Sequence, residues 1–441
     1  MHCARPWTSP RAERRTAYPY ATVSNVSTDV IVIGAGVAGL VCAGELTRAG
    51  LEVEVLETSD GIGGRIRTDV VDGFRCDRGF QLLNPAYPAA RELLDLDALD
   101  LRRFGAGVGV AAHGHLRVLA DPRRSPTLLP ATLRSGYLRP GELLRLARWA
   151  APAIGPLRTG GPDTGLRESL DASGASGRLR SDVLEQFLAG VLADDSGATS
   201  TRFVHLLVRS FLRGTPGVPA AGMQAIPAQL AGHLRAPVRT SSPVGRIRAR
   251  NGVEVDTPEG SMRAPAVVVA TDPVGAGRLT GTPTPAMKGL STYWFDAPEA
   301  PTELDLVLLD GRGPGAGPIV NAAVMTNPAP SYAPAGRPLV QATTLLRRGQ
   351  QPSVDEESAV RGQLEQMLAV STGDWRLVVV HHVRDALPEQ LPPLDPRRPV
   401  DLGEGLFVAG DHRDTASTQG ALVSGRRAAR AVARRLALGP V

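Results

Sequence analysis

The first strong hydrophobic pattern of the chain lies close to its N-terminus. Residues 29–33 (DVIVI) form a β-branched run that is typical of a buried strand. A glycine-rich turn follows, and apolar residues then recur at helical spacing until Gly50. Residues 51–57 (LEVEVLE) alternate as in a second strand. This order predicts one βαβ unit.

Between residues 85 and 220 the pattern changes to Leu- and Arg-rich segments of helical spacing, which alternate with Pro- and Gly-rich loops. Segment 140–154 (PGELLRLARWAAPAI) is one of these helical segments. Its apolar residues would suit either a shallow membrane contact or a helix that covers a cleft. We expect the second role.

Strands are predicted again further along the chain. A hairpin-like pair precedes the buried run 266–270 (AVVVA). The following segment contains an aromatic strand at 291–295 (STYWF) and a helix at 353–370. The C-terminal part is predicted to form a strand at 405–410 (GLFVAG), then a loop and a long helix.

These elements predict an α/β fold class with a Rossmann-like nucleotide-binding domain built from separated segments. Two insertions between the segments are expected to form an α+β substrate domain, with the chemistry in the cleft between the domains. The predicted ranges are 29–85, 220–282 and 396–441 for the nucleotide-binding domain, 86–219 and 283–395 for the substrate domain, and 1–28 for a disordered tail.

Composition and charge exclude several classes of function. The 441 residues are 42% hydrophobic and 21% charged, as in an ordinary soluble protein. Lys288 is the only lysine among the 49 lysine and arginine residues. Such a preference for arginine is typical of a bacterial genome with a high GC content, so the basic character does not indicate a function. Aromatic residues make up only 4% of the chain, and the arginines form no stripe. We therefore expect no nucleic-acid partner.

The three cysteines, Cys3, Cys42 and Cys76, are too scattered for a disulfide framework or a metal site. We expect Cys42 and Cys76 to be structural thiols in a reducing, cytoplasmic compartment. The chain has no run of 18 apolar residues, so no membrane-spanning helix is predicted.

The turn after the first strand carries the clearest chemical motif. Gly34, Gly36 and Gly39 form G-x-G-x-x-G between a strand and a helix. Gly34 would permit the tight turn, Gly36 the approach of a pyrophosphate, and Gly39 the close packing of helix and strand. The helix N-terminus would supply free N–H groups for phosphate. Dinucleotide binding follows.

Glu57 ends the second predicted strand, where an acid accepts a hydrogen bond from a ribose hydroxyl. An acid there disfavours a 2′-phosphate and leaves NAD and FAD as alternatives. The stretch GIGGR follows at once, whereas an NAD domain normally continues into its next helix. Gly63 and Gly64 would let the backbone approach the cofactor, and Arg65 would neutralise a pyrophosphate. This favours FAD.

The stretch VIGAGVAGLVCAGELTRAGLEVEVLETSDGIGGRIRT resembles the FAD-binding signature of the superfamily of flavin-containing amine oxidases, protoporphyrinogen oxidases and phytoene desaturases. Two further stretches support the resemblance, which implies a non-covalent FAD. SPVGRI is similar to a strand in which Val244 would bond the adenine through its backbone. LFVAGDHRDTASTQGALVSGRRAA is similar to the last FAD segment of these proteins.

In that last segment, the resemblance implies that Gly410 and Asp411 meet the pyrophosphate and ribityl groups. It also implies that the helix beginning near Gln419, Gly420 and Ala421 points its N-terminus at the flavin O2. A helix N-terminus would stabilise the negative charge of reduced flavin there. The expected reaction is hydride transfer from an organic substrate to flavin N5. Oxygen or another acceptor would then reoxidise the flavin.

The sequence does not identify a catalytic base. The cleft candidates are Gln81 and Asn84 in the loop RGFQLLNPAYP, His412 beside the predicted flavin loop, and Tyr293 in the aromatic strand. Amine oxidases often carry a lysine near flavin N5, but we expect Lys288 to lie at the surface. We therefore expect a larger, apolar substrate. A redox-neutral isomerase or saturase and an amine oxidase proper remain alternatives.

Overall fold

The computed structural model describes residues 28–112, 114–155, 162–249, 252–313, 315–353 and 355–436. The predicted tail lies outside the described residues except for Thr28.

A parallel sheet forms the nucleotide-binding half of the molecule. Its strand order is β18-β12-β1-β2, and every neighbouring pair is parallel. The strands come from three distant parts of the chain. They are β1 (Val30–Ile33), β2 (Val53–Leu56), β12 (Ala266–Val269) and β18 (Leu406–Val408).

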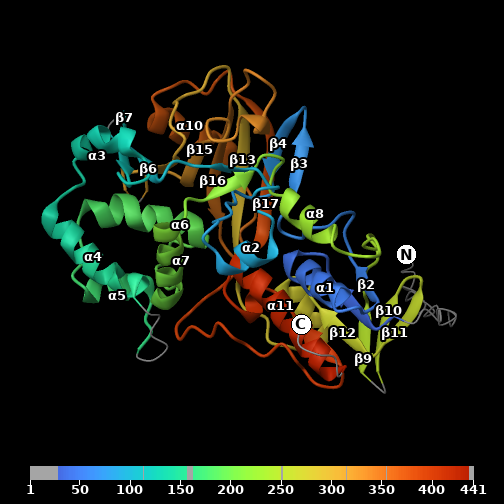
Figure 1. Cartoon of the computed structure of the whole chain (residues 1–441). Coiled ribbons are helices and arrows are strands. Elements are labelled where there is room, and N and C mark those ends of the chain that lie inside the picture. Colours follow the sequence, from blue (N-terminus) through green and yellow to red (C-terminus); the bar gives the residue numbers. More distant parts are fainter. Residues whose placement is uncertain are drawn as a thin grey trace, which may run out of the picture.

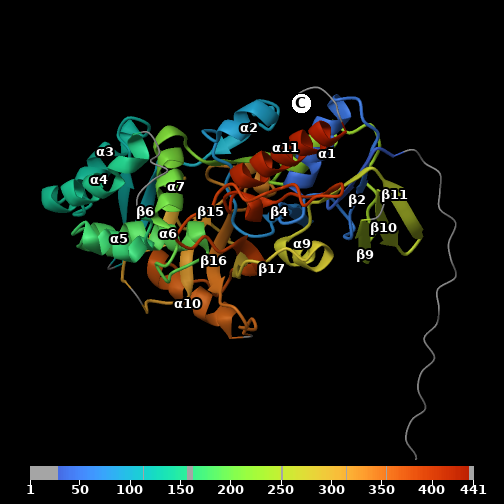
Figure 2. The same cartoon turned by 90° about the horizontal axis from the view of Figure 1, so that it is seen from below.

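Two helices lie side by side against this sheet, α1 (Val37–Arg48) and α11 (Thr418–Arg435) (Figures 1 and 2). They cross closely because Gly425 has no side chain: a Cβ there would lie 2.3 Å from the carbonyl oxygen of Ala38. The first and last parts of the chain thus pack into one layer.

The predicted hairpin before β12 is a three-stranded antiparallel sheet. Its strands are β9 (Arg246–Ala249), β10 (Val253–Thr257) and β11 (Gly260–Ala264). Two short helices flank this part of the chain, α8 (Ala225–Ala231) and α9 (Pro273–Thr280).

A seven-stranded mixed sheet forms the second half, with the order β17-β13-β16-β15-β14-β6-β7. Both predicted insertions contribute strands, and the parallel pair β6–β14 joins them. Helix α10 (Glu356–Leu368) packs on one face of this sheet. The strands are β6 (Gly107–Ala112), β7 (His115–Ala120), β13 (Met287–Asp296), β14 (Val307–Asp310), β15 (Ile319–Val324), β16 (Leu339–Leu346) and β17 (Arg376–Pro388).

A helical cluster from the first insertion lies at the end of the molecule opposite β9–β11 (Figures 1 and 2). It comprises α3 (Leu129–Arg134), α4 (Pro140–Ile154), α5 (Leu166–Ala172), a π-helical turn (Leu179–Leu184), α6 (Glu185–Leu192) and α7 (Thr201–Arg213). The remaining elements are α2 (Pro88–Leu93), the strand pairs β3 (Thr68–Val71) with β4 (Phe74–Asp77) and β5 (Leu101–Arg103) with β8 (Gly217–Pro219), and the 3-10 turns 126–128, 330–332 and 411–413.

The predicted α/β class, with a Rossmann-like sheet from separated segments and an α+β part from the insertions, is confirmed. The domain limits remain a prediction. The expected surface position of Lys288 is wrong. Lys288 lies in β13, and its Nζ donates to Asp194 Oδ2 at 2.7 Å and to Thr199 Oγ1 at 2.9 Å. Its side chain is only 11% exposed, because the segment between α6 and α7, which carries Asp194 and Thr199, packs against it.

Candidate active site

A single cavity of about 1030 Å³ extends from the parallel sheet to the helical cluster. At one end it is lined by the turn after β1, the loop after β2 and the start of α11. At the other end it is lined by α4, α6 and α7. The cavity therefore reaches both halves of the molecule.

The three glycines of the first turn differ in what a side chain would meet. A Cβ on Gly34 would lie 2.6 Å from the carbonyl oxygen of Ala270, and one on Gly39 would lie 2.0 Å from the carbonyl oxygen of Gly34. These two positions exclude side chains by packing. A Cβ on Gly36 would meet no atom within 4 Å, and Gly36 lines the cavity. Its backbone is therefore open to a ligand.

Gly36 is also the N-cap residue of α1, and no side chain caps this helix. The first N–H groups of the 12-residue helix are thus not used by a capping side chain, and Val37 and Ala38 line the cavity. A helix N-terminus with free amides favours an anion such as a diphosphate.

Glu57 lines the cavity just after β2 and is only 7% exposed. Its Oε2 accepts from the Ala35 amide at 2.7 Å, and its Oε1 accepts from the amide and hydroxyl of Ser59 at 2.9 and 2.8 Å. These bonds hold the carboxylate beside the α1 N-terminus. Because a carboxylate has about four acceptor sites, it can still accept from a ribose hydroxyl.

Gly63 and Gly64 bring the second glycine-rich loop against the first. The Gly63 amide donates to the carbonyl oxygen of Ala35 at 2.8 Å, and both glycines have positive φ, 112° and 60°. A Cβ on Gly64 would lie 3.5 Å from Gly36 Cα. The two loops therefore touch through backbone alone, and both line the cavity.

Arg65 does not stand free in the cavity. Its guanidinium donates to both carboxylate oxygens of Asp411, at 2.9 and 2.6 Å, and to the carbonyl oxygen of Ala386 at 2.9 Å. Both charged residues line the cavity. Arg67, two residues further along, pairs with Asp60 at 2.8 Å and so braces the loop.

The start of α11 faces the cavity through Ser417, Thr418 and Ala421. Ser417 is the N-cap and accepts from the Gly420 amide at 3.1 Å. Two predicted contacts lie outside the lining: Gly420 packs on Thr415, and Gln419 accepts from the Ala89 amide at 3.0 Å.

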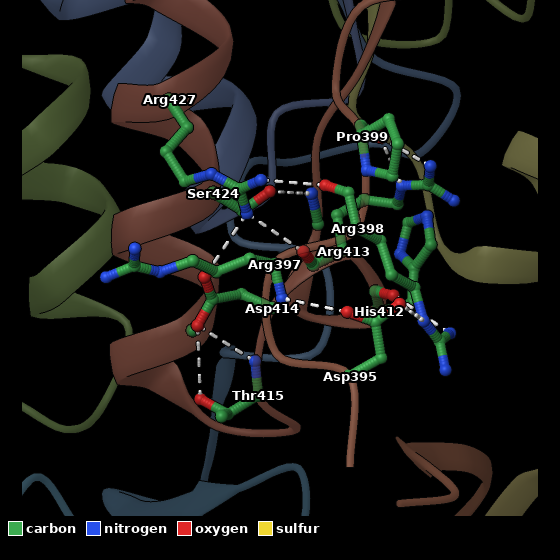
Figure 3. A network of polar contacts seen from close by, with 12 residues as sticks. Asp395, Arg397, Arg398, Pro399, His412, Arg413, Asp414, Thr415, Ser424 and Arg427 are labelled. Atoms are coloured by element: carbon green, nitrogen blue, oxygen red, sulfur yellow. Dashed lines mark hydrogen bonds and ion pairs between the residues drawn. The ribbon is translucent and has the colours of Figure 1, made fainter. Parts of the chain in front are cut away.

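A polar network behind this turn positions the loop before α11 (Figure 3). The Arg427 guanidinium donates to the carbonyl oxygens of Arg413 and Arg398 at 3.0 and 2.7 Å. The Gly410 amide donates to Ser424 Oγ at 3.0 Å. Gly410 lines the cavity, so the network holds its backbone at the wall.

Val244 lies between the predicted hairpin and the cavity. It is 6% exposed and lines the cavity together with Ser242 and Arg278. This is the end of the cavity that also contains Glu57. The predicted contact of Val244 with adenine remains a prediction.

The cleft candidates Gln81 and Asn84 both line the cavity. Gln81 Nε2 donates to the carbonyl oxygens of Arg65 and Arg78 at 2.7 and 3.1 Å, so it ties two loops together. Asn84 is 2% exposed, and its Oδ1 accepts from the Ala86 amide at 2.9 Å. Its Nδ2 is buried with no hydrogen-bond partner among the described residues.

Two other candidates are not part of the lining. Tyr293 stacks on Phe295 in the core beneath α10, on the face of β13 opposite to the cavity-lining Leu290. Side chains alternate along a strand, so the aromatic run could not face one way throughout. His412 is 2% exposed and packs against Gly410. Burial lowers the pKa of His412 to about 4.

The predicted structural role of the thiols agrees with their positions. Cys42 and Cys76 are buried and free, and burial raises the pKa of both thiols well above its usual value. Within the described ranges, no three His, Cys, Asp or Glu side chains are grouped so that they could hold a metal.

The sequence interpretation missed the far end of the cavity, a chamber of apolar side chains. The stripe in α7, where every fourth residue is large and apolar, was a usable signal. We call this set the apolar chamber: Leu138, Leu146, Trp149, Val183, Leu184, Phe187, Val191, Phe203, Leu207, Val208 and Phe211.

The chain matches the sequence model of one protein family over most of its length. Residues 37–433 match the model of the flavin-containing amine oxidoreductases. The chain belongs to this family. FAD is the family's cofactor, and the open backbone at Gly36 and the acid at Glu57 fit an FAD whose diphosphate lies at the α1 N-terminus. The predicted resemblance, the cofactor and the class of FAD-dependent oxidoreductase are confirmed.

Solved structures share the fold. One is described as a protoporphyrinogen oxidase from Exiguobacterium sp. 255-15, with a TM-score of 0.71 at 18% identity, covering 94% of this chain and all of that one. Another is cyclohexylamine oxidase from Brevibacterium oxydans IH-35A, with a TM-score of 0.68 at 19% identity, covering 93% and 100%.

Sequence relatives match over a short segment only. Putrescine oxidase of Kocuria rosea is 38% identical over 92 residues, which is 20% of this chain and 19% of the relative. Phytoene desaturase of Fusarium fujikuroi is 46% identical over 61 residues, 14% of this chain and 11% of the relative. The matched segments thus span less than a fifth of these relatives, and substrate and reaction are not transferred by them.

Proposed function

We propose that this protein is an FAD-dependent oxidoreductase that oxidises or desaturates an apolar organic molecule. The observation that carries the proposal is the continuity of the cavity. One space of about 1030 Å³ joins the dinucleotide turn at Gly36 to the apolar chamber. Such a volume is large enough for a dinucleotide part and a substrate part side by side.

FAD, when bound, would supply a hydride acceptor at flavin N5. The chain's own residues have the task of holding and orienting. The first turn of α1 presents uncapped amide groups to the cavity, where they would stabilise phosphate, and the positive end of α11 faces the cavity at Ser417 and Thr418, where it would stabilise reduced-flavin charge. Because Arg65 is paired with Asp411, its charge is already balanced by a carboxylate before any phosphate binds.

The chamber supports an apolar substrate. Its walls are large aliphatic and aromatic side chains from α4, α6 and α7, and burying apolar surface there is favourable by about 25 cal/mol per Å². Asn84, which lines the same cavity outside the chamber, has a buried Nδ2 with no hydrogen-bond partner among the described residues. An acceptor oxygen on the substrate would satisfy this donor.

An amine oxidase proper is the second candidate, since putrescine oxidase is among the relatives. The position of Lys288 weighs against it. This lysine is bonded to Asp194 and Thr199 and does not line the main cavity. A lysine that acts near flavin N5 would have to line the cavity that holds the flavin.

The test is anaerobic mixing of the purified, flavin-loaded protein with two probes. We expect phytoene, dispersed in detergent, to bleach the flavin absorption, and putrescine to leave it unchanged. Bleaching by putrescine alone would replace the proposal with amine oxidation. Product analysis separates a net oxidation from a redox-neutral isomerisation, and oxygen uptake on readmitting air identifies the acceptor. A protein that takes up no FAD would contradict the proposal altogether.

A further inference from the structure

The exposed large apolar side chains of this protein are not scattered. Of nine such residues in the described part of the chain, six lie on α3, α4 and the end of α7. We call this set the α3–α4 face: Leu129, Leu133, Leu143, Leu144, Ile154 and Leu212. Single exposed apolar residues need no explanation, but a group of this size marks an interaction surface.

Helix α4 has two apolar faces with different surroundings. One carries Leu146 and Trp149 and lines the cavity. The other carries Leu144, Ala147, Ala151 and Ile154, which recur at helical spacing and are all exposed, Leu144 to 63% and Ile154 to 70%. A helix that only covered a cleft would have a polar outer face.

The net charge around this face is positive. Between positions 121 and 155 the chain contains six arginines and two acidic residues, Asp121 and Glu142. Asp121 pairs with Arg123 and Arg124, and Glu142 pairs with Arg139 at 3.5 Å, so the excess positive charge comes from Arg134, Arg145 and Arg148. Arg134, Arg139 and Arg148 are exposed. Apolar side chains flanked by arginine suit the headgroup region of a bilayer with anionic lipids.

The position of the face agrees with this. Helices α3 and α4 form one end of the molecule in both views, far from β9–β11 (Figures 1 and 2). Leu212 belongs to the α3–α4 face and also lines the cavity, so the cavity wall reaches the surface there. No helix among the described residues is long and apolar enough to cross a bilayer.

We propose that the α3–α4 face docks on the surface of an anionic lipid bilayer and that the cavity receives its substrate from the acyl phase. Leu133, Leu144 and Ile154 would enter the acyl boundary while the arginines contact lipid phosphates. The second half of this inference rests on the proposed apolar substrate. The first half does not.

The test is co-sedimentation of the flavin-loaded protein with phosphatidylcholine vesicles, with and without phosphatidylglycerol. We expect binding to the anionic vesicles that weakens with salt. The double variant Leu144→Ser with Ile154→Ser should lower the bound fraction about tenfold. The matched control, Val70→Ser with Leu391→Ser, removes two exposed apolar side chains elsewhere and should bind as the wild type. Arg134→Gln with Arg148→Gln should remove the preference for anionic vesicles.

Three results would overturn the docking proposal. The wild type could stay in the supernatant with both vesicles, or the two double variants could bind equally. Sedimentation velocity could also show a wild-type dimer that only the Leu144→Ser, Ile154→Ser variant loses, which would make the face a contact between copies. Flavin content and bleaching by detergent-dispersed phytoene, measured on the same samples, report on the proposed function independently of vesicle binding.

Discussion

Arg65 and Asp411, which are 346 positions apart in the chain, form a bidentate ion pair with N–O distances of 2.9 and 2.6 Å. Arg65 follows the second glycine-rich loop, and Asp411 follows β18. The pair therefore locks the two ends of the cofactor region to each other. The sequence motifs predict a separate cofactor contact for each residue.

Removing one partner of this pair should cost stability as well as cofactor. We expect Arg65→Ala to lower the free energy of unfolding of the apoprotein by about 2 kcal/mol, since Asp411 would stay buried without its partner. Arg65→Lys should recover only part of this lost free energy, because an ammonium group cannot make both hydrogen bonds to Asp411 in the same geometry. Urea unfolding measures this. The control is Arg67→Ala, whose partner Asp60 is 81% exposed, so its loss should cost clearly less unfolding free energy than that of Arg65. Equal losses for the two alanine variants would contradict the prediction.

Alanine substitutions of two glycines in the first turn should affect different properties, stability for Gly39 and FAD affinity for Gly36. Gly39→Ala would place a Cβ 2.0 Å from a backbone oxygen, so we expect a loss of about 3 kcal/mol in unfolding free energy. Gly36→Ala meets no atom within 4 Å and should cost about 1 kcal/mol or less. Its methyl group would point at the cofactor, so FAD affinity should fall by about tenfold or more. Denaturant unfolding and flavin fluorescence separate the effects.

Glu57 should matter for FAD and not for the fold of β2. We expect Glu57→Gln to lower FAD affinity about tenfold, because an amide offers fewer acceptor sites for the ribose and for the Ala35 amide. Glu54→Gln on the same strand is the control, since Glu54 pairs with Arg239 and does not line the cavity. If titration gave the two variants the same FAD affinity, Glu57 would not be the ribose acceptor.

Substitutions in the apolar chamber should weaken substrate binding and leave FAD binding unchanged. Leu207→Gln keeps the volume but places an amide among apolar side chains, at a cost of about 1–3 kcal/mol to binding of an apolar ligand. We expect the amount of phytoene needed for half-maximal bleaching to rise about tenfold or more, with unchanged FAD content. Leu206→Gln, which changes a neighbour that does not line the cavity, serves as the control.

The buried Asp77 should make stability depend on pH. Burial raises its pKa from 3.8 to about 6, although Thr68, Met223 and Tyr332 donate to it. Between these values the folded state binds more protons than the unfolded state, so this carboxyl makes stability fall as pH rises. We expect the stability of the wild type relative to Asp77→Asn to drop by about 2 kcal/mol from pH 4 to pH 7. A difference that is constant across this range would show that Asp77 does not titrate as described.

The local motifs were readable from the sequence because their geometry is made by neighbours in the chain. A glycine turn between a strand and a helix dictates where Gly34, Gly36 and Gly39 lie, whatever the rest of the fold. The position of Glu57 could be predicted in the same way, because it ends the second strand of the same βαβ unit. The α/β class could be predicted for the same reason, since strand and helix periods are local properties.

The outcomes that sequence reasoning missed depend on which segments meet in space. Lys288 was expected at the surface, but the segment between α6 and α7 covers its side chain through Asp194 and Thr199. Tyr293 could have faced either side of β13, and only the packing of α10 decides which. The apolar chamber arises where α4, α6 and α7 converge, and the pairing of Arg65 with Asp411 requires β18 to return beside the start of the chain. Such contacts join residues that lie from tens to hundreds of positions apart, and periodicity carries no information about them.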